Sequence, residues 1–150
     1  MGEIRFLKSK EIKQILGLLK EQWGYEKKLD YNFLIDTEGD IFLINKDVEK
    51  IRFEDLRINS LGVYFAEYRN DELRLSIEGS NIIGKDAQKN IINISDDEIK
   101  YYVKGEDLPS EADYKGFILL RNNGDFFGCS RIKNGRLLNF YPKSRRINVF

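Results

Sequence analysis

The sequence predicts an α+β fold, in which an N-terminal α+β domain packs on a C-terminal small β-barrel. Apolar residues fall at helical spacing between residues 9 and 23, and from residue 116 the apolar pattern alternates with a period of two. Asn-Gly pairs at residues 123–124 and 134–135 mark tight turns between predicted strands. A chain of 150 residues has room for one ordinary domain or for two small ones that share an interface.

The N-terminal half is predicted to hold one helix and two hairpins. Ser9 is placed to N-cap a helix that runs to about Trp23, and Gly24 supplies its left-handed stop. Two pairs of strands, each around a four-residue turn, are predicted over 31–36 and 41–44 and over 61–68 and 73–77. A polar, partly helical stretch through Leu56 separates the two hairpins.

The C-terminal half begins near residues 75–78, so the predicted domains are 1–75 and 76–150. No Pro- or Gly-rich linker marks this boundary, which indicates packed halves rather than tethered ones. A helical turn over 79–83 and a strand over 90–94 come first. Ser95 and Glu98 then form a capping box for a helix that ends at Gly105.

Three short strands complete the chain, over residues 116–121, 126–132 and 136–141. The turns between them carry the Asn-Gly pairs, which are the strongest hairpin signal in the sequence. Three meandering strands, together with the upstream strand at 90–94, predict a small barrel that closes its own sheet edges.

Charge is distributed unevenly along the chain. The last 36 residues carry eight Lys or Arg and one acid, Asp125, so their net charge is +7. The remaining 114 residues carry 17 basic and 24 acidic side chains, a net charge of −7. A basic, strand-rich segment with several aromatic residues is the electrostatic pattern expected of a nucleic-acid binder.

The composition argues against several classes of enzyme. The chain has no histidine, which excludes His-based acid–base chemistry and His-ligated zinc, and a single Cys129 cannot form a thiolate metal site. Neither of the common glycine-rich nucleotide loops occurs. The lone cysteine, and the absence of a signal peptide or an apolar membrane-spanning run, favour a soluble cytoplasmic protein.

Residues 116–147 carry a recognisable pattern. It consists of GFILL at 116–120, an Asn-Gly turn, FGCSR at 127–131 and GRLLNFYPK at 135–143, with LRLSIEG at 73–79 and GEDL at 105–108 upstream. This pattern resembles the C-terminal module of the Sun/Fmu-type RNA cytosine-C5 methyltransferases and their stand-alone archaeal relatives, over roughly residues 73–150. The resemblance implies a PUA-like barrel that binds structured RNA in RNA modification or ribosome assembly.

The catalytic features of that family are missing from the sequence. Its methyltransferase domain needs a glycine-rich S-adenosylmethionine loop and catalytic cysteines in Pro-Cys and Thr-Cys contexts, whereas Cys129 lies in neither context. The resemblance therefore implies an RNA-binding part without the catalytic part, and no cofactor is expected.

Two groups of basic residues are candidate RNA contacts. Lys and Arg neutralise phosphates, and each contact adds affinity that depends on salt. The candidates are Lys143, Arg145 and Arg146 in the tail, and Arg131, Lys133 and Arg136 around the second Asn-Gly turn. The alternatives are a solvated basic tail for the first group and ordinary surface solubility for the second.

Adjacent aromatic residues are a second kind of candidate. In Phe126-Phe127 and Phe140-Tyr141 one ring of each pair should face inward and the other outward. An outward ring such as that of Tyr141 can stack on an unpaired base, whereas packing in the core is the alternative. Acidic runs at 96–98 and 71–72 are explained by helix capping and by a turn, so no metal site is predicted.

The leading hypothesis is therefore a non-catalytic protein that binds ribosomal or transfer RNA. An RNA methyltransferase or a ribosome-assembly factor acting in trans is the expected protein partner. The alternative is a protein–protein adaptor that recruits such a factor without itself contacting RNA. An enzyme that uses carboxylates alone is a third hypothesis.

Overall fold

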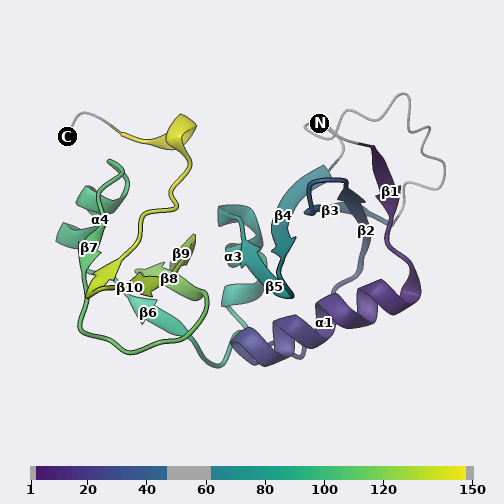
Figure 1. The fold of residues 1–150 in the computed structure, drawn as a ribbon, viewed down its shortest axis with the longest axis horizontal. Helices are drawn as coiled ribbons and strands as arrows, with labels where there is room; N and C mark the ends of the chain where they lie inside the picture. Colours follow the sequence, from purple (N-terminus) through teal and green to yellow (C-terminus); the bar gives the residue numbers. More distant parts are fainter. Residues whose placement is uncertain (1–2, 47–61, 148–150) are drawn as a thin grey trace.

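The computed structural model describes residues 3–46 and 62–147 and has an α+β fold (Figure 1). Three α-helices accompany one five-stranded and two three-stranded sheets in these residues. The predicted helical stretch through Leu56 and the start of the strand predicted at Leu61 lie outside the described residues. No helix in the described ranges is long and apolar enough to cross a membrane.

The N-terminal half is an antiparallel sheet with one helix across a face. The strands are β1 (Ile4–Phe6), β2 (Tyr31–Asp36), β3 (Asp40–Asn45), β4 (Gly62–Arg69) and β5 (Glu72–Leu75), adjacent in that order. Both predicted hairpins are confirmed, but the strand predicted over 73–77 ends at Leu75, because a helix, α3 (Ile77–Gly84), begins at Ile77. Asn70 and Asp71 have φ values of 53° and 58°, so these two residues supply the left-handed turn without a glycine.

The first helix is confirmed with a shift of one residue at its start. α1 covers Ser9–Trp23, and Gly24 ends it with a φ of 65°. The N-cap is Lys8 rather than Ser9, because the backbone N–H of Lys8 donates to the Glu11 carboxylate at 2.9 Å. A guanidinium from Arg5 also binds this carboxylate, and together these contacts lower the pKa of Glu11 to about 2.

The C-terminal half contains two helices and six short strands. The capping box of Ser95 and Glu98 is confirmed, since the Ser95 hydroxyl accepts from the Glu98 backbone and the Glu98 carboxylate accepts from that of Ser95. The elements are α3 (Ile77–Gly84), β6 (Ile91–Asn93), α4 (Asp96–Tyr102), β7 (Leu108–Pro109), β8 (Ile118–Asn122), β9 (Asp125–Ser130), β10 (Ile132–Lys133), β11 (Arg136–Leu137) and a 3₁₀ turn, η2 (Lys143–Arg145).

The prediction of a closed barrel is wrong for the described residues. β6, β8 and β9 form one sheet, in which β6 and β8 are parallel, and β10, β11 and β7 form another. The strand predicted over 126–132 divides after Ser130, whose hydroxyl donates to the Leu138 carbonyl at 2.6 Å. The strand predicted over 136–141 ends at Leu137 because the next polar groups bind the loop after α4.

Asn139 makes those loop contacts. Its backbone N–H donates to the Asp107 carboxylate at 2.7 Å, and its side-chain amide donates to the carbonyls of Tyr102 and Glu106. Pro109 of β7 pairs with Arg136 of β11. Because proline has no backbone N–H, it cannot extend the hydrogen bonding between these two strands. In this segment, hydrogen bonds between Asn139 and the loop after α4 therefore replace the strand-to-strand hydrogen bonds that a continuous sheet would make.

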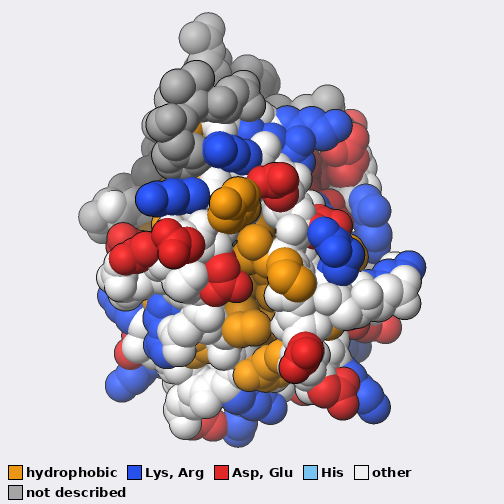
Figure 2. All heavy atoms as spheres, turned by 90° about the vertical axis from the view of Figure 1, so that its left-hand side faces the viewer, with side chains coloured by type: hydrophobic (Ala, Val, Ile, Leu, Met, Phe, Trp, Pro, Cys, Tyr) orange, Lys and Arg blue, Asp and Glu red, His pale blue; other side chains and the backbone are white. Residues whose placement is uncertain are grey.

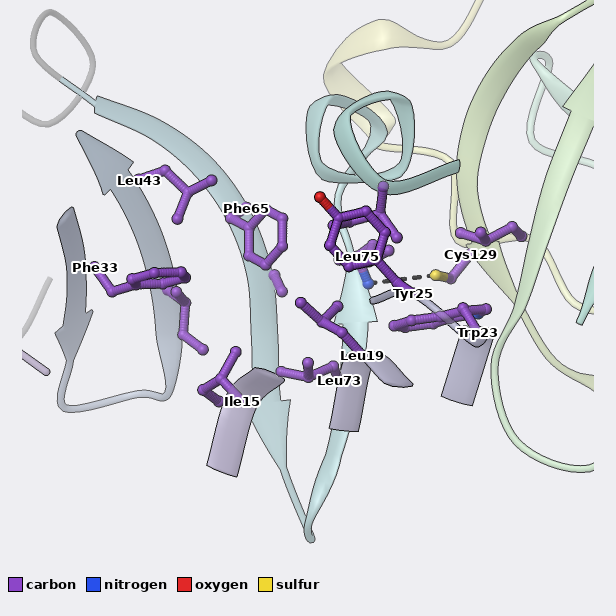
Figure 3. Packing of buried hydrophobic residues seen from close by; sticks show 14 of the residues in the cluster. Ile15, Leu19, Trp23, Tyr25, Phe33, Leu43, Phe65, Leu73, Leu75 and Cys129 are labelled. Carbon is purple, nitrogen blue, oxygen red and sulfur yellow. Dashed lines mark hydrogen bonds between the residues drawn. The ribbon is translucent and has the colours of Figure 1, made fainter. Parts of the chain in front are cut away.

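The two halves share one hydrophobic core. Figure 3 shows Trp23, Tyr25 and Leu75 of the first half close to Cys129 of β9, with Phe33, Leu43 and Phe65 further into the sheet. The backbone N–H of Leu75 donates to the Cys129 sulfur at 3.3 Å. Ile83, Leu119 and Phe126 complete the contribution of the second half. The halves are therefore packed together, and the division at residue 75 stays a prediction.

α3 lies between the halves and contacts both (Figure 1). The side-chain amide of Asn81 donates to the Phe126 carbonyl at 2.9 Å and accepts from the Phe126 N–H at 3.0 Å. The buried Ser80 hydroxyl accepts from the Gly128 N–H at 2.9 Å. On its other side Gly79 lies so close to Phe65 that a Cβ would overlap the Phe65 carbonyl. α3 thus joins β4 to β9.

Candidate nucleic-acid interface

The hairpin of β10 and β11 presents two exposed cations side by side. Lys133 and Arg136 are direct partners across the strands, on either side of Asn134 and Gly135, which have φ values of 54° and 74°. Directly opposed side chains lie about 4.5–5.5 Å apart at Cβ, and like charges in such a pair repel. No acidic partner of either residue occurs among the described residues. This hairpin pair is therefore available to an anion.

Arg131 does not join the hairpin pair, although the sequence places all three residues around one turn. Its guanidinium binds the Glu72 carboxylate of β5 and lies 4.3 Å from the centre of the Phe117 ring. Its Nε atom is buried and has no acceptor among the described residues. Arg131 thus contacts the N-terminal half, where its charge is neutralised.

The three basic residues of the tail also differ from one another. Lys143 is exposed, and no ion pair of its ammonium occurs within the described ranges. Arg145 binds the Glu78 carboxylate at the start of α3. The guanidinium of Arg146 covers Gly105, where a Cβ would come within 2.7 Å of the Arg146 Nε. Neither Lys143 nor Arg146 has an ion-pair partner among the described residues, but Lys143 is exposed whereas Arg146 is half-buried against Gly105.

Tyr141 packs against a second, smaller hydrophobic cluster within the C-terminal half, which comprises Ile94, Tyr102, Leu108, Leu120 and Leu137. Its ring lies edge-on to Tyr102, with 6.1 Å between centroids, and is half-buried. Tyr102 is fully buried, and burial raises its pKa to about 12. The Tyr102 hydroxyl accepts the Phe140 N–H at 3.2 Å, which fixes the backbone beside Tyr141. In this pair the more exposed ring is Phe140, at 36%.

Tyr101 is an exposed ring that the sequence interpretation did not select. It is 54% exposed, the highest value among the large hydrophobic side chains described. Lys104 lies 5.8 Å from its ring centre. The helical spacing of Ile99, Tyr102 and Val103 leaves Tyr101 outside the buried stripe, and this signal was available in the sequence.

A pocket of about 640 Å³, called the junction pocket here, lies where the two halves meet. Tyr64 and Arg74 of the sheet and Phe140 of the tail all line it. The Arg74 guanidinium lies 5.2 Å from the Phe140 ring centre. Burial, followed by the nearby Asp40 charge, raises the pKa of Tyr64, so its hydroxyl stays protonated. The lining comprises residues 62–64, 74–78 and 127–129 with Phe140, Pro142, Ser144 and Arg145.

One acidic cluster has the geometry of a cation site, but hydrogen bonds within the β2–β3 turn account for why these carboxylates lie close together. Carboxylate oxygens of Asp36, Glu38 and Asp40 lie within 4.8 Å of one another. An Asp36 oxygen accepts the backbone N–H groups of Glu38 and Asp40, both at 2.9 Å, and so closes the β2–β3 turn. Burial, with Asp36 and Glu67 nearby, raises the pKa of Asp40.

The surface of the C-terminal half mixes both charges. Figure 2 shows Lys and Arg side chains around this face with Asp and Glu between them, and hydrophobic side chains form a strip through its middle. The excess of +7 in the sequence is therefore not one continuous basic patch on this face. Individual exposed cations, such as the hairpin pair, have to be considered separately.

These features define residues 91–147 as a small β-rich module with a cationic hairpin and a tail that returns to the N-terminal half. Residues 89–147 match the family model described as the Methyltransferase RsmF PUA domain. This part of the chain is a PUA domain of the RsmF methyltransferase type, which confirms the resemblance seen in the sequence. PUA domains are typically RNA-binding and are found in RNA-modifying methyltransferases, and the match covers only this domain of the enzyme. No curated protein matches the chain.

Proposed function

We propose that this protein binds structured ribosomal or transfer RNA through its PUA domain and assists RNA modification or ribosome assembly without catalysing a reaction itself. The observation that carries the proposal is the match of residues 89–147 to a methyltransferase PUA domain. An RNA methyltransferase or an assembly factor acting in trans in the cytoplasm is the proposed protein partner.

The hairpin pair supports this proposal on physical grounds. Lys133 and Arg136 repel one another across the hairpin, and a phosphate between them removes that repulsion. Arg additionally binds phosphate with two parallel N–H groups. Lys143 is the third proposed phosphate contact, because its charge is equally open. Arg131, Arg145, Arg146 and Tyr141 are proposed to support the surface, since each is held by contacts within the protein.

The salt dependence of RNA binding tests the proposal. Each phosphate contact contributes about −0.7 to −0.9 to the slope of log affinity against log salt concentration, so three contacts give a slope of about −2 to −3. The measurement is a titration of a labelled transfer RNA and a ribosomal RNA helix at several salt concentrations. Binding that does not change with salt, or no binding to either RNA, contradicts the proposal.

The hydrophobic strip in Figure 2 and the exposed ring of Tyr101 favour the adaptor as the second candidate. An adaptor keeps its protein partner and shows no RNA affinity. Glu substitutions at Lys133, Arg136 and Lys143 separate the two functions. Loss of RNA binding with the protein partner retained supports RNA recognition. A wild-type chain that binds the partner but no RNA, and whose variant keeps the partner, supports the adaptor.

A further inference from the structure

We propose that the junction pocket receives one unpaired nucleotide of the bound RNA. This inference rests on the proposed function and adds to it the kind of RNA feature that is recognised. The pocket has a volume of about 640 Å³, within the range of about 300–1,000 Å³ that is usual for small-ligand sites. Its walls come from the PUA domain and from the N-terminal half, so an occupant contacts both.

Aromatic and guanidinium groups line the pocket in an arrangement suited to a nucleobase. Phe140 and Tyr64 both remain 36% exposed although they line a concave site. The Arg74 guanidinium lies 5.2 Å from the Phe140 ring centre. Unpaired RNA bases stack on aromatic rings and on the planes of arginine side chains. The Arg74 guanidinium already lies over the Phe140 ring, so the surfaces on which one base can stack are the exposed parts of the Phe140 and Tyr64 rings and the outer face of the guanidinium.

Phe140 is held in place before any ligand binds. Its backbone N–H donates to the buried Tyr102 hydroxyl at 3.2 Å, and its ring meets Phe117 edge-on with 6.2 Å between centroids. A ring that is fixed in this way loses little conformational freedom when a base stacks on it.

Two ion pairs hold the pocket's cations in position. Arg74 binds Glu67 at 3.4 Å, and Arg145 binds Glu78. The four side chains are between 21% and 47% exposed, so these pairs are weak and leave guanidinium N–H groups free. The free N–H groups can donate hydrogen bonds to the ring nitrogens and carbonyl oxygens of a base, while the Glu78 carboxylate can accept from its amino group.

This combination indicates a nucleotide rather than an apolar peptide. A nucleotide supplies both a flat π face for the rings and hydrogen-bond acceptors for the free N–H groups of the two ion-paired arginines. A base inside a double helix has its faces and its pairing edge occupied, so only an unpaired base can enter. The RNA recognised is therefore one with a bulged, looped or terminal nucleotide next to the helix that the hairpin pair contacts.

The test compares a short hairpin RNA that carries a single bulged adenine with the same hairpin fully paired. We expect the wild-type protein to bind the bulged RNA about 5- to 150-fold more tightly, the range given by one stacked base. Phe140→Leu removes the ring and keeps the backbone contact, and Ser144→Trp fills the pocket from an exposed position. Both variants should bind the two RNAs equally.

Tyr101→Leu is the matched control, because it removes an exposed ring outside the pocket. It should keep the preference for the bulged RNA, and thermal unfolding of each variant verifies that it is folded. A preference that survives in Phe140→Leu and Ser144→Trp overturns the pocket assignment, and so does equal binding of both RNAs by the wild type. In both cases the proposed function stands. Failure to bind either RNA overturns the function and the pocket together.

Discussion

The β10–β11 hairpin and the junction between the halves both carry basic residues of the same C-terminal segment, but they use them differently. At the hairpin, Lys133 and Arg136 oppose each other in solvent, and no acid in residues 3–46 or 62–147 pairs with either. At the junction, Arg131 binds Glu72 of β5 and Arg145 binds Glu78 of α3. A positive charge counted in the sequence is therefore available to a phosphate only where no acid from elsewhere in the chain neutralises it.

The largest expected effect comes from separating the halves at α3. In Gly79→Ala the new Cβ overlaps the Phe65 carbonyl, a backbone atom that cannot move aside without displacing α3 from β4. We expect the free energy of unfolding to fall by about 3 kcal/mol or more. The measurement is urea unfolding followed by circular dichroism.

Gly17→Ala is the matched control for that substitution. Gly17 lies in α1 with nothing within 4 Å of its added Cβ, so the change should stabilise the protein by about 0.5–1 kcal/mol. If Gly79→Ala unfolds within about 0.5 kcal/mol of the wild type, the range of ordinary surface substitutions, α3 does not hold the halves together.

The next effect concerns the hairpin alone. Lys133→Glu combined with Arg136→Glu should weaken RNA binding by about 10- to 100-fold, equal to about 1.4–2.7 kcal/mol. The salt slope should become shallower by about 2, because two phosphate contacts are lost. Lys10→Glu combined with Lys13→Glu, on the exposed face of α1, makes the same change in net charge. An equal loss in this control would mean that overall charge, and not the hairpin, determines affinity.

At the junction, burial of Cys129 predicts a pH effect. Burial raises the pKa of its thiol from 9.0 to about 12, so the folded protein keeps the proton while the unfolded chain loses it above pH 9. The stabilisation is complete below pH 9 and is lost as the pH rises from there towards 12. The stability of the wild type relative to Cys129→Ala should fall by about 1.4 kcal/mol between about pH 8 and about pH 10.

Comparison with Cys129→Ala cancels the titration of tyrosine and lysine residues, which both proteins share. Unfolding free energies at the two pH values provide the measurement. Rapid reaction of the wild-type thiol with a thiol reagent under native conditions would show that the junction opens far below the global unfolding energy.

Patterns within short stretches of the sequence predicted most of the helices, strands and turns, but not how the strands assemble into sheets. The helical spacing before Gly24, the capping box at Ser95 and the two Asn-Gly turns are each encoded within a few residues, and all of them are confirmed. The division of the last strands into two sheets depends on Ser130 and Asn139, whose partners lie up to 37 residues away. Such contacts leave no periodic signal in one sequence.

The candidate site was predictable to a similar extent. The turn geometry placed Lys133 beside Arg136 correctly, because both flank Asn134-Gly135. The Glu72 partner of Arg131 is 59 residues away, so the sequence could not reveal that this charge is neutralised. The junction pocket was missed for the same reason, since Tyr64 and Phe140 come from distant segments.

The smallest expected effects are those of single substitutions, one at the junction (Arg131) and one at the hairpin (Lys133). Arg131→Ala removes the ion pair with Glu72 and the contact with the Phe117 ring, at 39% side-chain exposure, and should cost about 1 kcal/mol of stability. Lys133→Ala, two residues further on, removes only repulsion from Arg136 and should leave stability unchanged within about 0.5 kcal/mol. For RNA affinity we expect the opposite: Lys133→Ala should bind RNA more weakly than Arg131→Ala.

Urea unfolding and RNA titration of both variants, with Glu72→Gln completing a double-mutant cycle, supply the measurement. The coupling between Glu72 and Arg131 should account for part of the Arg131→Ala loss, because one partner without the other leaves a half-buried charge unpaired. If Arg131→Ala instead weakens RNA binding as much as Lys133→Ala and keeps full stability, Arg131 exchanges Glu72 for a phosphate on binding. The junction and the hairpin would then form one continuous RNA-binding surface.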